Sequence, residues 1–270
     1  MSVSGRQSIA VLGAGEAGRL FSADLIRAGA AVTIYDPAYS GNELRQAIPG
    51  VTPAAGESQA VAGADVVFSV NTAAEAMVAM TNALQSLVSD LPGLWVDFNT
   101  AAPQLKRELN DYSAARGVDF IDAAIMSPVE GKGLASPIYL SGAKAHDLAA
   151  VMASLGGNAT AVEGPVGSAA AKKLLRSIFF KGVAGVVLEA LEAAEAAGDL
   201  EWFSEHLAQQ FHDFDRDIVT RLVSGTHRHA ARREQEMIAA TEFARDLGVE
   251  PRITHAIVEA LHRLQAQQPE

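Results

Sequence analysis

The first part of the chain alternates short apolar runs with longer amphipathic stretches. The runs are rich in β-branched residues, which is typical of strands buried in a parallel sheet. Strands are expected at residues 8–12, 30–36, 64–70, 94–98, 118–125, 137–140 and 159–162. Helical periodicity occupies residues 19–28, 73–88, 103–116 and 145–155. This alternation predicts an α/β domain over residues 1–163 with a doubly wound, mostly parallel sheet.

After residue 163 the pattern is helical only. A glycine-containing turn is followed by a long proline-free stretch that ends at Gly198, a residue suited to the position after a helix. Further helices are expected at residues 201–222, 228–247 and 251–265. Three such helices are too few for a core of their own, so they should pack on the long helix. The prediction is an all-α domain over residues 164–270, built on a long interdomain helix and used for substrate binding or dimerisation.

A glycine motif follows the first expected strand and precedes a helix. Its residues read G-x-G-x-x-G and are Gly13, Ala14, Gly15, Glu16, Ala17 and Gly18. In that setting the glycines allow a tight turn and the close approach of a pyrophosphate to a helix N-terminus. The motif predicts a Rossmann-type dinucleotide site. A glycine turn that only packs a βα unit is the alternative.

Asp36, at the end of the second expected strand, bears on the choice of cofactor. A carboxylate there accepts hydrogen bonds from a ribose 2′-hydroxyl and repels a 2′-phosphate. The nearest following arginine is Arg45, and the intervening sequence contains no obvious phosphate clamp. The sequence therefore favours NAD, with NADP less favoured.

Small polar residues stand where later strands are expected to end. Asn71, Thr72 and Asn99 are candidate cofactor contacts, because ligands bind beyond the carboxyl ends of parallel strands. The same residues are suited to capping the helices that follow, and the two roles are compatible. Residues 122–142 interrupt the rhythm with a loop rich in glycine, proline and serine. That loop is either a substrate cover or an inert hairpin connection.

The charges of the long helix are opposite to those that its dipole favours. Its first half carries Lys172, Lys173, Arg176 and Lys181, and its last part carries Glu189, Glu192 and Glu195. Lys173, Ser177 and Lys181 are spaced to share one face. An anion bound on that face would account for the inversion, and a solvated cationic face is the alternative.

The overall charge excludes some partners. The chain of 270 residues has a net charge of −11, which argues against nucleic acid. It has no cysteine and no apolar run of the roughly 18 residues that a membrane span needs. The first apolar run is too short for a signal peptide, so a cytoplasmic protein without membrane association is expected. Small residues on the long helix would allow close packing against a second subunit, which predicts a homodimer.

Histidines raise the question of a metal site. His255, Glu259 and His262 are spaced to share a helix face, but they match no recognised zinc spacing, and no metal is expected. The arginine- and histidine-rich segment 226–237 is either a closure of the substrate pocket or a solvated helix face.

Three segments together resemble the β-hydroxyacid dehydrogenase family, which includes 3-hydroxyisobutyrate dehydrogenase and relatives of 6-phosphogluconate dehydrogenase. They are the glycine motif with its flanking strand and helix, DAAIMSP at 122–128, and GPVGSAAAKKLLRS at 164–177. The second is similar to the family pattern D-A-P-V-S-G-G. The third is similar to G-x-x-G-x-G-x-x-x-K-x-x-N-N. The chain looks like a divergent branch with a short helical C-terminal domain.

The resemblance implies an NAD(P)-dependent oxidoreductase. Hydride would pass between the nicotinamide and the hydroxyl carbon of a hydroxy acid, and the family lysine, which falls on Lys173, would be the general acid or base. Two alternatives are an imine or enamine reductase of the same fold and a non-catalytic dinucleotide-binding protein.

The resemblance also implies substrate contacts. They fall on Met126 and Ser127 near the family's serine, and on Arg176 and Ser177 in place of its paired asparagines. Arg176 can donate two parallel hydrogen bonds to an anion, and Lys181 adds a charge on the same helix. A small anionic substrate is therefore expected.

Overall fold

The computed structural model describes residues 7–267 of the chain. It divides into two compact units, one that ends at Arg176 and one that begins at Ser177, which are described separately. The division falls inside one long helix, whereas the sequence predicts a domain boundary just before that helix.

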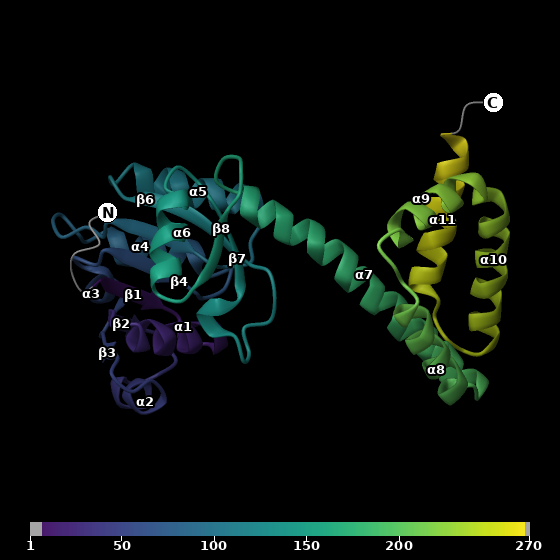
Figure 1. Cartoon of the computed structure of the whole chain (residues 1–270), viewed down its shortest axis with the longest axis horizontal. Coiled ribbons are helices and arrows are strands. Elements are labelled where there is room, and N and C mark those ends of the chain that lie inside the picture. Colours follow the sequence, from purple (N-terminus) through teal and green to yellow (C-terminus); the bar gives the residue numbers. More distant parts are fainter. Residues whose placement is uncertain (1–6, 268–270) are drawn as a thin grey trace. The chain divides into compact units, whose positions relative to one another are not determined.

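The first unit is built on an eight-stranded sheet with the order β3-β2-β1-β4-β5-β6-β7-β8 (Figure 1). Every neighbouring pair is parallel except β6 and β7. The strands are β1 Ser8–Leu12, β2 Ala31–Tyr35, β3 Thr52–Pro53, β4 Val66–Ser69, β5 Leu94–Asp97, β6 Asp119–Ile125, β7 Pro137–Ser141 and β8 Asn158–Ala161. The doubly wound α/β fold predicted from the sequence is confirmed.

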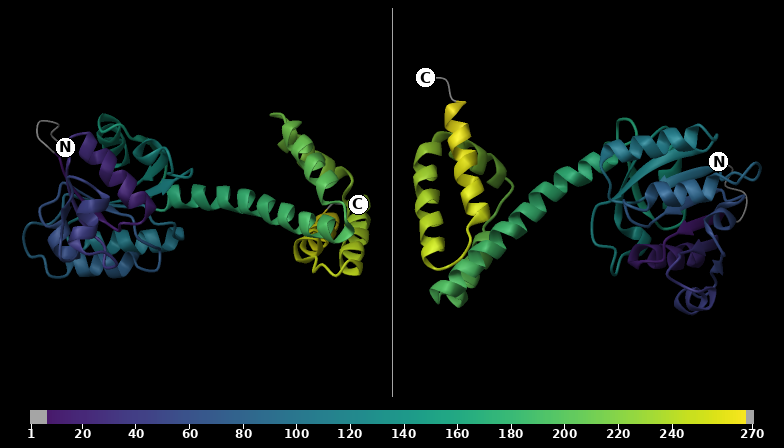
Figure 2. Two further views of the ribbon diagram at one scale, coloured as in Figure 1. Left: turned by 90° about the horizontal axis from the view of Figure 1, so that it is seen from below. Right: turned by 180° about the vertical axis from the view of Figure 1, so that it is seen from behind.

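Helices cover both faces of this sheet (Figure 2). One face packs mainly against α1 (Glu16–Arg27), α2 (Gly41–Ala47) and α6 (Ala145–Ser154). The other packs against α3 (Glu57–Val61), α4 (Ala76–Leu84) and α5 (Pro103–Ala114). The strands alternate between the two layers, so that Ile9 and Val11 enter the first core and Ala10 and Leu12 the second.

The strand order creates the crevice where a ligand binds in such folds. The chain passes from β1 to β2 on one side and returns to β4 on the other side of β1. Loops at the carboxyl ends of β1 and β4 therefore diverge, and the space between them is the topological switch point.

The second unit is helical. It contains the later part of α7 (Ser168–Ala197), α8 (Leu200–His212), α9 (Ile218–Arg228), α10 (Ala230–Asp246) and α11 (Arg252–Ala266). The α7 carboxylate of Glu189 accepts hydrogen bonds from the backbone N–H groups of Ile253 and Thr254, each at 2.8 Å. The N-terminus of α11 is thus held against the long helix.

Some expected elements differ from the structure. The single helix expected at 201–222 is wrong, because the chain breaks into α8 and α9. At the break Asp215 accepts the backbone N–H of Asp217 at 2.9 Å and the guanidinium of Arg221 at 2.8 Å, and these bonds compete with helix continuation. The expected helix at 73–88 is shorter, and β3, α2 and α3 were not expected.

Candidate dinucleotide and active site

The glycine loop after β1 has the geometry of a dinucleotide cradle. Gly13 has φ +110°, and a Cβ there would overlap the carbonyl oxygen of Val70. A Cβ on Gly18 would overlap the carbonyl oxygen of Gly13. Gly15 differs, because a Cβ there would meet nothing within 4 Å. Gly13 and Gly18 are thus required by the fold, and Gly15 faces open space at the start of α1.

Asp36 is fixed beside this loop. One carboxylate oxygen accepts the backbone N–H of Ala14 at 2.6 Å and the other accepts that of Ala38 at 2.8 Å. A carboxylate oxygen has further lone pairs, so both retain capacity for a ribose hydroxyl. Arg19, in the first turn of α1, donates Nε to the Ala14 carbonyl at 2.6 Å and stacks over the Tyr39 ring at 4.6 Å.

A pocket of about 330 Å³ lies at the switch point. Five of the residues predicted to bind the cofactor line it together, namely Gly13, Gly15, Asp36, Asn71 and Thr72. Of the other predicted residues, Ala14, Glu16, Ala17 and Gly18 complete the loop and the start of α1 without lining the pocket.

The pocket is acidic. Asp36, Glu57 and Glu75 line it, and its described lining includes no lysine or arginine. Burial raises the pKa of the lining residue Tyr35, and the charges of Glu57 and Asp36 raise it further. This field disfavours an additional phosphate near Asp36.

Asn99 is buried behind the pocket wall. Its exposed fraction is 4%, and its amide nitrogen donates to Asn71 Oδ1 at 2.5 Å and to Asp97 Oδ1 at 2.7 Å. Its Oδ1 has no hydrogen-bond partner among the described residues. Buried acceptors are rarely left unpaired, so this oxygen is an exception among the polar groups beside the pocket.

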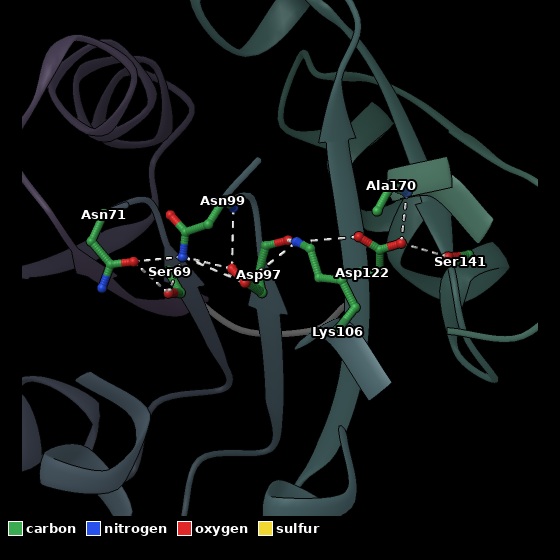
Figure 3. Close-up of polar contacts among 8 residues, drawn as sticks. All are labelled: Ser69, Asn71, Asp97, Asn99, Lys106, Asp122, Ser141 and Ala170. Atoms are coloured by element: carbon green, nitrogen blue, oxygen red, sulfur yellow. Dashed lines mark hydrogen bonds and ion pairs between the residues drawn. The ribbon is translucent and has the colours of Figure 1, made fainter. Parts of the chain in front are cut away.

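Three buried charged groups lie beside Asn99 (Figure 3). Lys106, from α5, places Nζ 3.4 Å from Asp97 Oδ2 and 3.2 Å from Asp122 Oδ1, and all three side chains have 0% exposure. Burial raises the pKa of the Asp97 carboxyl, and the Lys106 charge opposes that shift. This cluster was not predicted, because nothing in the periodicity of residues 103–116 marks Lys106 as inward-facing.

Asp122 also holds the start of α7. Its Oδ2 accepts the backbone N–H of Ala170 at 2.9 Å and the hydroxyl of Ser141 at 3.0 Å. Ser141 Oγ in turn accepts the N–H of Ala169 at 3.0 Å. Two N–H groups of the first turn, which lack partners within a helix, are thereby satisfied by side chains of the sheet.

The remaining predicted residues do not line the described pocket. Lys173 is half-buried on α7, three residues after Ala170, and Arg176 is exposed one turn later. Ser177 and Lys181 lie on the part of α7 that belongs to the second unit.

Met126 and Ser127 follow β6 and are half-buried. The backbone N–H of Met126 donates to Pro137 at 2.8 Å, which extends the β6–β7 pairing. The loop between these strands contains the short helix η1 (Gly133–Ala135), and the backbone N–H of Leu134 donates to Asp24 of α1 at 2.8 Å. The connection is therefore an antiparallel hairpin whose loop is hydrogen-bonded to α1.

The histidine- and arginine-rich surfaces of the second unit pair locally. His262 lies 3.1 Å from Glu234, and Arg232 lies 3.0 Å from Glu236. Within residues 7–267 no group of three histidine, cysteine, aspartate or glutamate side chains converges to hold a metal. None of the helices in that range is long and apolar enough to cross a membrane.

Comparison with known families agrees with the site. Residues 8–167 match the NAD binding domain of 6-phosphogluconate dehydrogenase, and residues 194–264 match a domain of unknown function, DUF1932. The chain therefore belongs to the 6-phosphogluconate dehydrogenase-like family of NAD-binding proteins, and the resemblance noted from the sequence is confirmed.

Among curated proteins the chain is similar to 3-hydroxyisobutyrate dehydrogenase of Pseudomonas aeruginosa. The two are 28% identical over 145 residues, which is 52% of this chain and 48% of that protein. The chain thus spans about half the length of this relative, and 61% of another, an uncharacterized 28.5 kDa protein of Methanothermus fervidus.

Among solved structures, a conserved hypothetical protein from Sinorhizobium meliloti 1021 is 30% identical, with a TM-score of 0.62 and coverage of 99% of this chain and 91% of that one. An imine reductase from Myxococcus stipitatus in complex with NADP+ is 18% identical, with a TM-score of 0.77 and coverage of 96% and 95%. Its V8 variant in complex with NAD+ is 21% identical, with a TM-score of 0.74 and coverage of 97% and 95%. At these identities the reductase likeness shows the fold alone, and the family match shows an NAD-binding domain.

Proposed function

We propose that the chain is an NAD-dependent dehydrogenase that acts on the hydroxyl group of a small anionic hydroxy acid. The observation that carries this proposal is the acidic pocket at the switch point, because its lining combines the glycine cradle with Asp36. The family membership supports the oxidoreductase class.

The residues present fit a dinucleotide. Gly15 leaves open space beside the start of α1, where a pyrophosphate can approach the backbone. Asp36 has acceptor capacity for a ribose hydroxyl, and it lines the same pocket as Gly13 and Gly15. When bound, the nicotinamide would accept or donate the hydride.

Lys173 would move the proton. In oxidation its neutral amine would take the proton from the substrate hydroxyl while the hydride leaves the same carbon, giving a carbonyl product. In reduction its ammonium would return that proton to the developing alkoxide. Arg176 would bind the substrate anion, and Met126, Ser127, Ser177 and Lys181 would shape its site.

A second candidate is the reduction of an imine. It is supported by the likeness to the imine reductase at a TM-score of 0.77. The two reactions differ in the atom that receives the proton, which is oxygen in the first and nitrogen in the second.

A thermal-shift titration with NAD, NADH, NADP and NADPH tests the cofactor assignment. A ligand that binds only the folded state raises the melting temperature by mass action. Stabilisation by NAD and NADH alone supports Asp36 as the ribose anchor. A preference for NADP would contradict it and point to Arg19. No shift with any of the four would favour a non-catalytic protein that has lost the cofactor.

Turnover then tests the chemistry. The purified chain would be assayed with a panel of hydroxy acids and a panel of cyclic imines, each with its preferred cofactor. Lys173→Ala is expected to keep dinucleotide affinity and to lower turnover about 100-fold or more. Lys172→Ala, which removes an exposed neighbouring lysine, is the matched control. Turnover of imines alone, or full turnover by Lys173→Ala, would contradict the proposal.

A further inference from the structure

Four buried polar side chains form a continuous row across the sheet of the first unit. Ser69 pairs in register with Asp97, Asp97 with Asp122, and Asp122 with Ser141, so that the row crosses β4, β5, β6 and β7. Register partners on adjacent strands project to the same face. Their exposed fractions are 0–1%.

This row is an unusual choice for a buried sheet face. The same face carries Val67, Trp95 and Phe120 one row away, all within an apolar core. Two carboxylates stand on neighbouring strands with Lys106 inserted between them (Figure 3). Apolar residues of similar volume at such positions are often as stable or more stable. Stability alone therefore does not explain the row.

The two ends of the row reach the two parts of the proposed active site. At one end Asn99 bonds Ser69 Oγ at 3.2 Å and Asn71, which lines the dinucleotide pocket. At the other end Ser141 and Asp122 accept the first-turn N–H groups of α7. Lys173 lies three residues beyond Ala170, a rise of about 4.5 Å along a helix.

Lys106 joins the two halves of the row. Its Nζ donates to the carbonyl oxygen of Asp97 at 2.8 Å and pairs with both carboxylates. We propose that Lys106 is a positioning residue, which fixes the first turn of α7, and with it Lys173, relative to the pocket wall at Asn71. This inference rests on the proposed function for the roles of Lys173 and of the pocket.

The test compares Lys106→Met with Lys144→Met in the full chain. Lys144 pairs with Asp119 on the surface of the same unit, where both side chains are about half exposed, so its removal controls for the loss of a lysine–aspartate pair. Ser141→Ala is a second variant, which removes one hydroxyl of the row and remains available if Lys106→Met does not fold. Each variant is measured by hydrogen exchange, dinucleotide titration and steady-state kinetics.

We expect the first-turn amides of α7 to exchange about 10-fold faster in Lys106→Met and Ser141→Ala. A displacement of about 1 Å at a reacting group lowers rates by about 100-fold. If the two variants displace Lys173 by that amount, their kcat should fall by about 100-fold. The dinucleotide dissociation constant should change by less than about 3-fold, because Lys106 does not line the dinucleotide pocket. Lys144→Met should match the wild type in all three measurements.

Two results would overturn the inference. One is wild-type exchange at the start of α7 in both row variants. The other is a fall in kcat that is fully explained by the fraction of unfolded protein and is accompanied by an equal loss of dinucleotide affinity. If the wild type turns over no substrate, the proposed function fails, and the exchange measurement alone decides whether the row holds α7.

Discussion

Gly15 and Gly18 belong to one motif, yet the structure assigns them different physical tasks. A methyl group on Gly15 meets open space, and its backbone φ of −67° suits any residue. A methyl group on Gly18 would overlap the carbonyl oxygen of Gly13, which is backbone and cannot rotate away. Gly15→Ala should therefore spare the fold and obstruct the ligand, whereas Gly18→Ala should damage the fold itself.

The magnitudes can be worked out. At a dinucleotide concentration of 100 times its dissociation constant, binding stabilises the folded state by about 2.7 kcal/mol. Domains of about 150–250 residues shift by about 2–4 °C per kcal/mol, which gives a ligand-induced rise of roughly 5–11 °C for the wild type. In Gly18→Ala, overpacking costs about 1–3 kcal/mol, so the ligand-free melting temperature should fall by roughly 2–12 °C.

Gly15→Ala is the more informative variant. Alanine is a poorer N-cap than glycine by under about 1 kcal/mol, and its lower entropy in the unfolded chain offsets about 0.4–1 kcal/mol. The ligand-free melting temperature should thus stay within about 2 °C of the wild type, while the ligand-induced rise falls below about 2 °C. Differential scanning fluorimetry of the three proteins, with and without dinucleotide, measures both quantities. An unchanged rise in Gly15→Ala would refute pyrophosphate binding against this residue.

Two further predictions concern the second unit. Glu189→Gln removes a charged acceptor from the N-terminus of α11 and should cost about 1–2 kcal/mol, with exposed Glu195→Gln as the control. Burial alone would raise the pKa of Glu189, but hydrogen bonds from Ile253 and Thr254 outweigh it and lower the pKa. The stabilisation by Glu189 is therefore present above the ordinary glutamate pKa and is lost as pH falls through the lowered value. Unfolding followed by circular dichroism at several pH values measures this loss. If Glu189→Gln lost as much stability on acidification as the wild type, the assignment would be contradicted. Light scattering should give about twice the 28.2 kDa monomer mass, and replacing the exposed Phe179 and Phe180 by serine should lower it; a monomeric wild type would contradict the homodimer.

Much of the first unit could be predicted because its signals are local. A β-branched run, a glycine motif and Asp36 at a strand end lie within a short stretch of chain, and the structure brings Asp36 to Gly13 and Gly15 in one pocket. Asn71 and Thr72 were predictable because the carboxyl ends of parallel strands meet at one edge of the sheet.

Lys106 could not be predicted in this way. It faces inward because Asp97 and Asp122, on two neighbouring strands, place carboxylates on either side of its amine, and pairing of that kind leaves no periodic trace in a helix. The inverted charges of the long helix were recognised, but the reason for Glu189 was not, since its partners in α11 lie 64 and 65 residues away. The break between α8 and α9 was missed because no glycine or proline lies there, and the bonds of Asp215 to Asp217 and Arg221 leave no signal in the periodicity.

The distant partner of Glu189 has a consequence for dissecting the protein. Pro251, at the start of α11, has no side chain that can accept a hydrogen bond, and the helix depends on a carboxylate from α7 instead. The family domain at the C-terminus begins at residue 194, after Glu189. A fragment cut at that boundary would contain every residue of α11 but not the acceptor of its first N–H groups. A helical fragment that folds on its own should therefore begin upstream of Glu189. That point lies inside α7, most of which falls between the two matched family domains, 8–167 and 194–264.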